Sequence, residues 1–175
     1  MNLKDKIRNI PDFPKKGIIF FDITTLIKDG EALKYSVDEM ANQYKGKKID
    51  AVMGAESRGF IFGAAIAYKL GVGFIPVRKS GKLPYKTCQV SYDLEYGSSS
   101  LEMHIDAINK GDNILIVDDL VATGGTAKAM AEIIEKMGGN VVGFSFLVEL
   151  SFLNPRKVLE GYDVRALVEY DCETM

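Results

Sequence analysis

Two adjacent aspartates followed by a threonine- and glycine-rich turn are the residues most able to do chemistry in this chain. Asp118 and Asp119 follow the apolar run 114–117, and residues 122–126 read Ala-Thr-Gly-Gly-Thr. Consecutive glycines let a ligand approach the backbone closely, and threonine hydroxyls can donate hydrogen bonds. The helical pattern that follows would present free backbone N–H groups to an anion. The stretch therefore predicts a phosphate site at a strand–turn–helix junction.

The two carboxylates restrict which phosphate compound fits. Asp118 and Asp119 would repel a bare phosphate, so they need other groups on the same ligand, such as ribose hydroxyls or Mg²⁺. A ribose 5-phosphate carries a phosphate at one end and a diol beside it. Aspartate and glycine pairs are also common in turns that only connect a strand to a helix. The interpretation as a ribose 5-phosphate site therefore depends on the full string of aspartates, threonines and glycines rather than on either pair alone.

The composition is that of one folded domain of 175 residues, expected to span residues 1–175. Its apolar content of 47% and charged content of 26% are ordinary for a globular protein. No window approaches the roughly 18 apolar residues of a membrane span, and the N-terminus has no signal-peptide core. We therefore expect a cytoplasmic protein with no membrane partner. Cys88 and Cys172 lack metal-ligand spacing and are expected to be reduced thiols.

The charged residues point to a local anion site rather than a basic surface. A net charge of −2 argues against a nucleic-acid partner. A strongly anionic ligand then needs cations concentrated near it. Single basic residues are usually solvated surface charges. Here they cluster around glycines after apolar runs, at Arg58 and at Arg78, Lys79, Lys82 and Lys86.

Apolar runs that alternate with helical patterns predict an α/β fold with a central, mostly parallel sheet flanked by helices. Helices are expected at 31–44 and 59–70, after the glycine turn through Met130 and Met137, and at 155–160. Strands are expected at 49–54, 73–77, 140–150 and 164–168, and just before the paired aspartates, where the apolar run should end.

Because the loops after parallel strands meet at one edge of a sheet, residues 55–59, 78–84 and 118–126 should converge there. Residues 80–100 break the periodicity, with at best two short alternating runs. A loop of this length predicts a functional lid, a plain β-hairpin arm, or both. Near the N-terminus, the apolar residues 18–21 could simply form an edge strand on the core.

Several strings between about residues 10 and 150 resemble the type I phosphoribosyltransferases, and most closely the adenine phosphoribosyltransferases. V-D-D-L-x-A-T-G-G-T at 117–126 resembles the family's phosphoribosyl-pyrophosphate (PRPP) motif. P-D-F-P-x-x-G-I-x-F-x-D-I-T at 11–24 resembles its N-terminal hood, and E-S-R-G-F at 56–60 resembles its D-S-R-G-F loop. Y-x-L-E-Y-G at 92–97 resembles its mobile loop. The resemblance implies the type I phosphoribosyltransferase fold, with a hood at 1–30 and a mobile lid at 80–104.

The resemblance implies transfer of the 5-phosphoribosyl group from PRPP to adenine, giving AMP and pyrophosphate in purine salvage. It also implies Mg²⁺ as a cofactor, carried by PRPP near Asp118 and Asp119 rather than held directly by the protein. Displacement at the anomeric carbon should pass through an oxocarbenium-like state, which favours holding the reactants in line and neutralising the departing pyrophosphate. Glu95 is the expected proton-transfer group, because lid closure would desolvate it. His104 is expected to be a surface residue.

The residues implied by the resemblance fall into three groups. The catalytic group is Glu95, Arg58, Asp118 and Asp119. The base is expected at Ile19, Phe20 and Leu150. PRPP or AMP is expected to contact Ser57, Arg58, Arg78, Lys79, Lys82, Tyr96, Asp118, Asp119, Ala122, Thr123, Gly124, Gly125 and Thr126. The chain departs from the family at Phe21, where many members have a basic residue, and at Glu56, where the family loop has Asp.

Two other functions stay open at this point. One is a PRPP-dependent transferase for another base, such as hypoxanthine, xanthine or orotate. The other is a PRPP-sensing regulator of transcription, which uses the same fold but would need a DNA-binding module or a basic face. The resemblance further implies a homodimer, with the basic segment near Lys82 reaching the partner's site.

Overall fold

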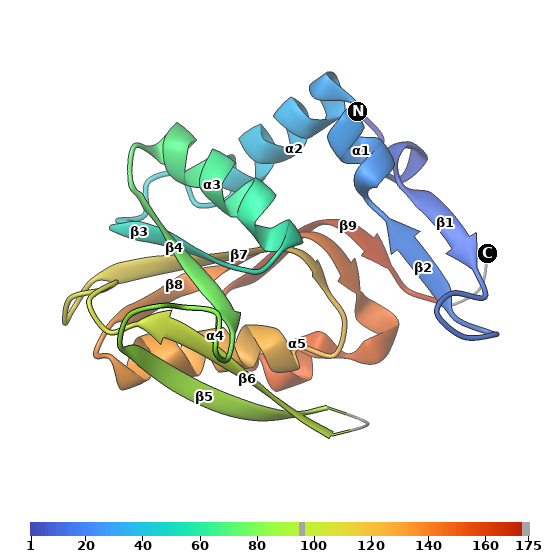
Figure 1. Ribbon diagram of the computed structural model, residues 1–175. Helices are drawn as coiled ribbons and strands as arrows, with labels where there is room; N and C mark the ends of the chain where they lie inside the picture. The colour runs from blue at the N-terminus through green and yellow to red at the C-terminus, as the bar shows by residue number, and fades with distance from the viewer. Residues whose placement is uncertain (95–96, 173–175) are drawn as a thin grey trace.

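The computed structural model describes residues 1–94 and 97–172, and within them a seven-stranded sheet lies between two layers of helices (Figure 1). The strand order is β5-β6-β4-β3-β7-β8-β9. Five neighbouring strands are parallel: β3 (Ala51–Ala55), β4 (Gly73–Lys79), β7 (Asn113–Val121), β8 (Asn140–Leu150) and β9 (Val164–Tyr170). The expected α/β class with a mostly parallel sheet is confirmed.

The helices pack on both faces of this sheet and enclose two hydrophobic cores. In Figure 1, α2 (Gly30–Asn42) and α3 (Arg58–Leu70) cover one face, and α4 (Gly125–Lys136) and α5 (Pro155–Val158) cover the other. Alternate residues of β7 face the two layers, so Leu115 joins the first core and Ile116 the second. None of the helices in the described part of the chain is long and apolar enough to cross a bilayer.

Strand register brings two polar segments to the same edge of the sheet. Gly54 of β3 pairs with Val117 of β7, so the residues after Ala55 emerge beside Asp118. The prediction that the apolar strand ends at the paired aspartates is wrong, because β7 continues to Val121. The long apolar strand β8 pairs along this extension, and such pairing overrides the low strand preference of aspartate.

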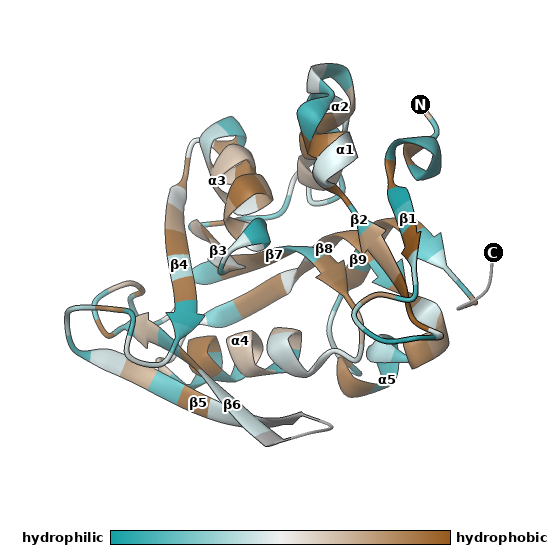
Figure 2. Cartoon of the chain, turned by 45° about the vertical axis from the view of Figure 1, so that its right-hand side comes forward, coloured by the Kyte–Doolittle hydropathy of each residue, from teal (hydrophilic) through white to brown (hydrophobic). Residues whose placement is uncertain are grey.

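The segment after β4 forms an antiparallel hairpin arm, one of the two structures predicted for it. β5 (Thr87–Leu94) pairs with β6 (Gly97–His104), and β6 adds to the edge of β4. Leu101 and Met103 are buried in the core that α4 covers. Figure 2 shows β4 brown along most of its length and teal at its arrowhead, where Arg78 and Lys79 end the strand. A role of this arm as a lid stays a prediction.

The N-terminal segment forms a separate two-stranded hairpin of β1 (Arg8–Pro11) and β2 (Ile19–Asp22), flanked by the 3-10 helix η1 (Leu3–Lys6) and by α1 (Thr24–Lys28). Arg8 donates two hydrogen bonds to Asp22 Oδ2, at 3.0 and 2.5 Å. These bonds, together with those from the backbone N–H and hydroxyl of Thr24, lower the pKa of Asp22 to about 2. Phe21, the departure from the family's basic residue, is buried and stacks on Tyr170 with ring centroids 4.0 Å apart. It is therefore a core residue.

The short helix α5, which follows β8 and the 3-10 helix η2 (Ser151–Leu153), supports the glycine turn. Gly124 has a φ of +92°, and a Cβ there would lie 3.2 Å from both the carbonyl oxygen of Pro155 and the Cβ of Val158. Arg156 ties α5 to the sheet, donating from Nε and Nη2 to the two carboxylate oxygens of Glu149 at 2.8 and 2.7 Å. The Glu149 side chain is 1% exposed.

Replacing Arg156 with alanine should lower the free energy of unfolding by about 3 kcal/mol, because it leaves the buried Glu149 carboxylate without its cation. Thermal and urea unfolding would measure this. Lys157→Ala, at the exposed neighbouring position on the same helix, is the matched control and should change stability by less than about 0.5 kcal/mol. Equal stabilities of the two variants would show that the Arg156–Glu149 pair does not hold α5.

Candidate active site

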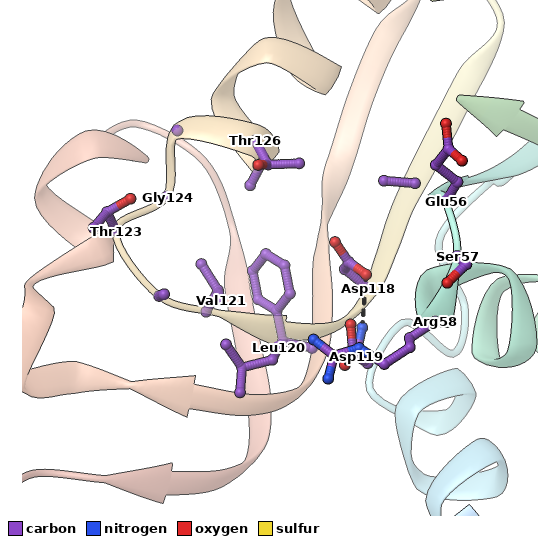
Figure 3. A pocket seen from close by; sticks show the side chains of 15 residues that line it. Glu56, Ser57, Arg58, Asp118, Asp119, Leu120, Val121, Thr123, Gly124 and Thr126 are labelled. Carbon is purple, nitrogen blue, oxygen red and sulfur yellow. Dashed lines mark hydrogen bonds and ion pairs between the residues drawn. The ribbon is translucent and has the colours of Figure 1, made fainter. Parts of the chain in front are cut away.

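The carboxyl ends of β3 and β7 border a cavity of about 250 Å³ (Figure 3). Its walls come from the turn after β3, from the end of β7 and from the first residues of α4, with Phe146 of β8 among the lining residues. Two of the three polar loops predicted to converge therefore do so. Of the residues predicted to contact PRPP, those that line the cavity are Ser57, Arg58, Asp118, Asp119, Ala122, Thr123, Gly124, Gly125 and Thr126.

Two helices begin at this cavity, and neither start is capped by a side chain. α3 begins at Arg58 and α4 begins at Gly125. Free N–H groups and the positive end of the helix dipole favour an anion at each start. In Figure 3, Thr123 and Gly124 lie toward one end of the cavity and Ser57 and Arg58 toward the other, with the aspartates between. The cavity thus offers two anion positions separated by carboxylates.

The aspartates are held close to the start of α3. Arg58 Nε lies 3.0 Å from Asp119 Oδ2, and the backbone N–H of Asp119 donates to Asp118 Oδ1 at 2.9 Å. A Cβ on Gly59 would lie 2.6 Å from Asp118 Oδ1, so this close approach requires glycine. Asp119 is 5% exposed, and its Oδ2, although it forms the ion pair with Arg58, accepts no hydrogen bond of good geometry within the described part of the chain. The hydrogen-bonding capacity of this buried oxygen is therefore left unfilled.

Both aspartates hold their protons more tightly than usual. Burial raises the pKa of Asp118 well above its ordinary range, and the neighbouring Asp119 carboxylate raises it further. Burial also raises the pKa of Asp119, against the opposing charge of Arg58. Such shifts are typical of groups kept for a ligand rather than for stability.

The basic residues predicted after β4 lie outside the cavity lining, and an acidic residue of that lining binds them. Arg78, Lys79 and Lys82 do not line the cavity, whereas Glu56 does. Glu56 Oε2 lies 3.3 Å from Arg78 Nη2 and 3.1 Å from Lys82 Nζ, and Oε1 accepts the backbone N–H of Lys79 at 2.7 Å. Burial pushes the pKa of Glu56 up, but these donors outweigh it and hold the pKa below its usual value.

Sequence reasoning missed two residues that shape the site. Glu56 was noted only as a departure from the family loop, although a charge directly after a buried strand is itself a signal. Tyr92 of β5 was quoted only as the first residue of the mobile-loop string, with no contact predicted for it, yet its hydroxyl lies 3.2 Å from that of Thr126 and hydrogen-bonds with it. This contact joins the hairpin arm to the start of α4. The signal for Tyr92 was its place in an alternating run that faces the core.

The residues predicted to bind the base do not line this cavity, but one of them lies next to it. The Phe20 ring lies 5.6 Å from Arg58 Cζ, and Phe13 packs edge-on against Phe20 at 5.2 Å. Leu150 is buried at the end of β8, and Ile19 packs against the same core. Glu95 and Tyr96, predicted for catalysis and for PRPP binding, lie outside the described residues.

Comparisons with known proteins agree with the residue patterns. A family model described as a phosphoribosyl transferase domain matches residues 24–166. An adenine phosphoribosyltransferase from Brachyspira hyodysenteriae is 62% identical over 170 residues, which cover 97% of this chain and 100% of the relative. The chain belongs to the adenine phosphoribosyltransferases. It is accordingly a transferase of the type I phosphoribosyltransferase fold.

Solved structures of adenine phosphoribosyltransferases share this fold over nearly their full length. The enzyme from Thermoanaerobacter pseudethanolicus superposes with a TM-score of 0.93 at 53% identity, covering 96% of this chain and 98% of that one. The Saccharomyces cerevisiae enzyme superposes with a TM-score of 0.88 at 39% identity, covering 94% and 95%. The similarity thus includes the hairpin arm and the helices that carry the cavity.

Asp118→Asn should raise the melting temperature near neutral pH by about 3 °C, which corresponds to roughly 1 kcal/mol for a chain of this size. The folded-state pKa of Asp118 lies above the unfolded value of 3.8. Between these two values the folded state binds more protons, so the free energy of unfolding falls as pH rises. The asparagine carries no such cost.

Calorimetry from pH 4 to pH 8 would measure both the gain and its pH dependence. Asp106→Asn, at an exposed aspartate, is the control and should leave both unchanged. A lower melting temperature for Asp118→Asn at pH 7 would contradict the idea that the buried carboxylate is unfavourable for folding.

Proposed function

We propose that this adenine phosphoribosyltransferase transfers the 5-phosphoribosyl group of PRPP to adenine, giving AMP and pyrophosphate. The observation that carries the proposal is the order of groups in one cavity: an uncapped helix start, two carboxylates, and a second uncapped helix start. PRPP has the same order, with a 5-phosphate, a ribose diol and a pyrophosphate. The names of the relatives supply adenine as the acceptor.

Each segment of the cavity then has a role. The turn 123–126 and the start of α4 bind the 5-phosphate through backbone N–H groups and threonine hydroxyls. Asp118 and Asp119 accept the ribose hydroxyls and stabilise the positive charge that develops at the anomeric carbon. Ser57 and Arg58, at the start of α3, bind the pyrophosphate. The bond from the anomeric carbon to the pyrophosphate oxygen breaks as the bond to an adenine ring nitrogen forms.

Adenine is proposed to lie between this cavity and the N-terminal hairpin. Phe20 would cover the base, because its ring lies next to Arg58 on that side. Backbone groups near Ile19 and the side chain of Leu150 complete the proposed base site. The Saccharomyces cerevisiae structure was determined as a complex with an iminoaltritol bisphosphate and adenine. Proton transfer by Glu95, PRPP contact by Tyr96 and closure of the arm over PRPP stay predictions.

Mg²⁺ fits this site as a companion of PRPP rather than as a resident ion. Carboxylate oxygens of Asp118 and Asp119 are hard donors that suit Mg²⁺. In the described residues, however, no three side chains of histidine, cysteine, aspartate or glutamate gather as a metal site. Bound with PRPP, the ion would neutralise charge on the departing pyrophosphate. A homodimer, Lys82 reaching the partner's site and a cytoplasmic location also stay predictions.

The proposal predicts that the purified protein releases pyrophosphate from PRPP and Mg²⁺ when adenine is supplied, and at least about a hundredfold more slowly with hypoxanthine, xanthine or orotate. A coupled pyrophosphate assay measures this for every base. Comparable rates with hypoxanthine would identify a transferase for another base. PRPP binding without turnover of any base would instead indicate a sensor.

Two variants connect this activity to the cavity. Asp119→Asn should lower the rate of AMP formation on the order of a hundredfold, because it removes a buried charge from the ribose site. Asp106→Asn, at an exposed position, should leave the rate unchanged. Full activity of Asp119→Asn would place the ribose elsewhere.

A further inference from the structure

Glu56 places a carboxylate between the candidate cavity and the basic turn formed by residues 78–82. The carboxylate meets three donors at once: the guanidinium of Arg78, the ammonium of Lys82 and the backbone N–H of Lys79. Its side chain is only 12% exposed. An acid in this position has an electrostatic cost, because it repels the pyrophosphate that the proposed function brings to the neighbouring Ser57 and Arg58.

The backbone of the basic turn does not depend on Glu56 alone. β4 is fixed by its pairing with β6, in which Arg78 lies opposite Glu102. Glu102 is buried and accepts the backbone N–H groups of Lys82 and Leu83, each at 3.0 Å. Within the described residues, the ion pairs of the Arg78 and Lys82 side chains are with Glu56. The distinct contribution of Glu56 is therefore to hold two cationic side chains.

These cations are not fully satisfied by Glu56. Arg78 Nε is buried and finds no hydrogen-bond partner in the part of the chain that the structure describes. A guanidinium has five N–H donors arranged to bind planar or multi-oxygen anions. A diphosphate offers more acceptor oxygens than one carboxylate does. The donors of the basic turn therefore suit an anion with more acceptor oxygens than the Glu56 carboxylate has.

We propose that Glu56 is a positioning residue that pairs with Arg78 and Lys82 when pyrophosphate is absent and releases them to the pyrophosphate group of PRPP when it binds. The proposal rests on the proposed function. It explains how cations predicted to bind PRPP can lie outside the cavity lining. Arg78 and Lys82 remain close to the proposed pyrophosphate position, paired with Glu56 and partly desolvated, until the pyrophosphate group binds.

This exchange has a measurable consequence for affinity. Pyrophosphate must displace the Glu56 carboxylate, so the pairing free energy is subtracted from the free energy of pyrophosphate binding. After the transfer, Arg78 and Lys82 can pair with Glu56 again. This pairing competes with the bound pyrophosphate and so favours its release. AMP carries no pyrophosphate and leaves the pairs intact. Glu56 should therefore weaken pyrophosphate binding selectively.

The test compares Glu56→Gln with the wild-type protein by titration calorimetry, using pyrophosphate with Mg²⁺ as one probe and AMP as the other. Glutamine keeps the size and the acceptor for the Lys79 N–H but removes the charge. We expect Kd for pyrophosphate to fall about fivefold, and Kd for AMP to change less than about twofold. Glu56→Asp, which draws the carboxylate back by one methylene, should give a smaller change in the same direction.

Glu102→Gln is the matched control, since Glu102 holds the same turn only through backbone N–H groups and the Thr87 hydroxyl. It should not tighten pyrophosphate binding. Unchanged or weaker pyrophosphate binding by Glu56→Gln would overturn the proposal, as would equal tightening by Glu102→Gln. Wild-type formation of AMP from adenine and PRPP reports on the proposed function separately. With that activity present, a negative calorimetric result removes only the role of Glu56.

Discussion

The burial of two adjacent carboxylates between two uncapped helix starts is the constraint on which this site depends. A buried charge is costly unless it is paired, and here Arg58 pairs with Asp119 while Asp118 receives one backbone N–H. The remaining cost appears as raised pKa values for both acids. Keeping this pair of carboxylates buried lowers the stability of the fold. A bound ligand that interacts with the carboxylates can restore that stability.

The rest of the fold keeps this arrangement rigid. The β3–β7 register brings the turn after Ala55 out beside Asp118, and Gly59 has no Cβ that would separate α3 from that carboxylate. On the other side, α5 packs against Gly124 and is tied to β8 by the Arg156–Glu149 pair. Tyr92 connects the hairpin arm to Thr126. Elements far apart in sequence thus position each end of the cavity.

The local sequence pattern predicted the bounds of an element to within one residue where the residues of that element alone determine them. The strand 140–150 has the predicted bounds, and the helix that follows the E-S-R-G turn begins one residue earlier than predicted, at Arg58. The sequence pattern was insufficient where pairing with another strand determines the structure. β7 runs past its aspartates because β8 continues beside it. The arm after β4 is the hairpin that was one of the two predicted structures, but the pattern did not predict that β6 pairs with β4. The Glu56–Lys82 contact spans 26 residues, so no local window contains it.

The pairing of charges also explains how a chain with a net charge of −2 can accept a ligand with many negative charges. Arg58 is paired with Asp119, and Arg78 and Lys82 are paired with Glu56, so each of these three cations already has an anionic partner. A ligand must exchange partners with these acids. Inorganic phosphate satisfies one helix start, but it leaves both aspartates without hydroxyl donors. Only a molecule with a phosphate, a diol and a second anionic group at the right spacing satisfies the whole set, and selectivity follows from that requirement.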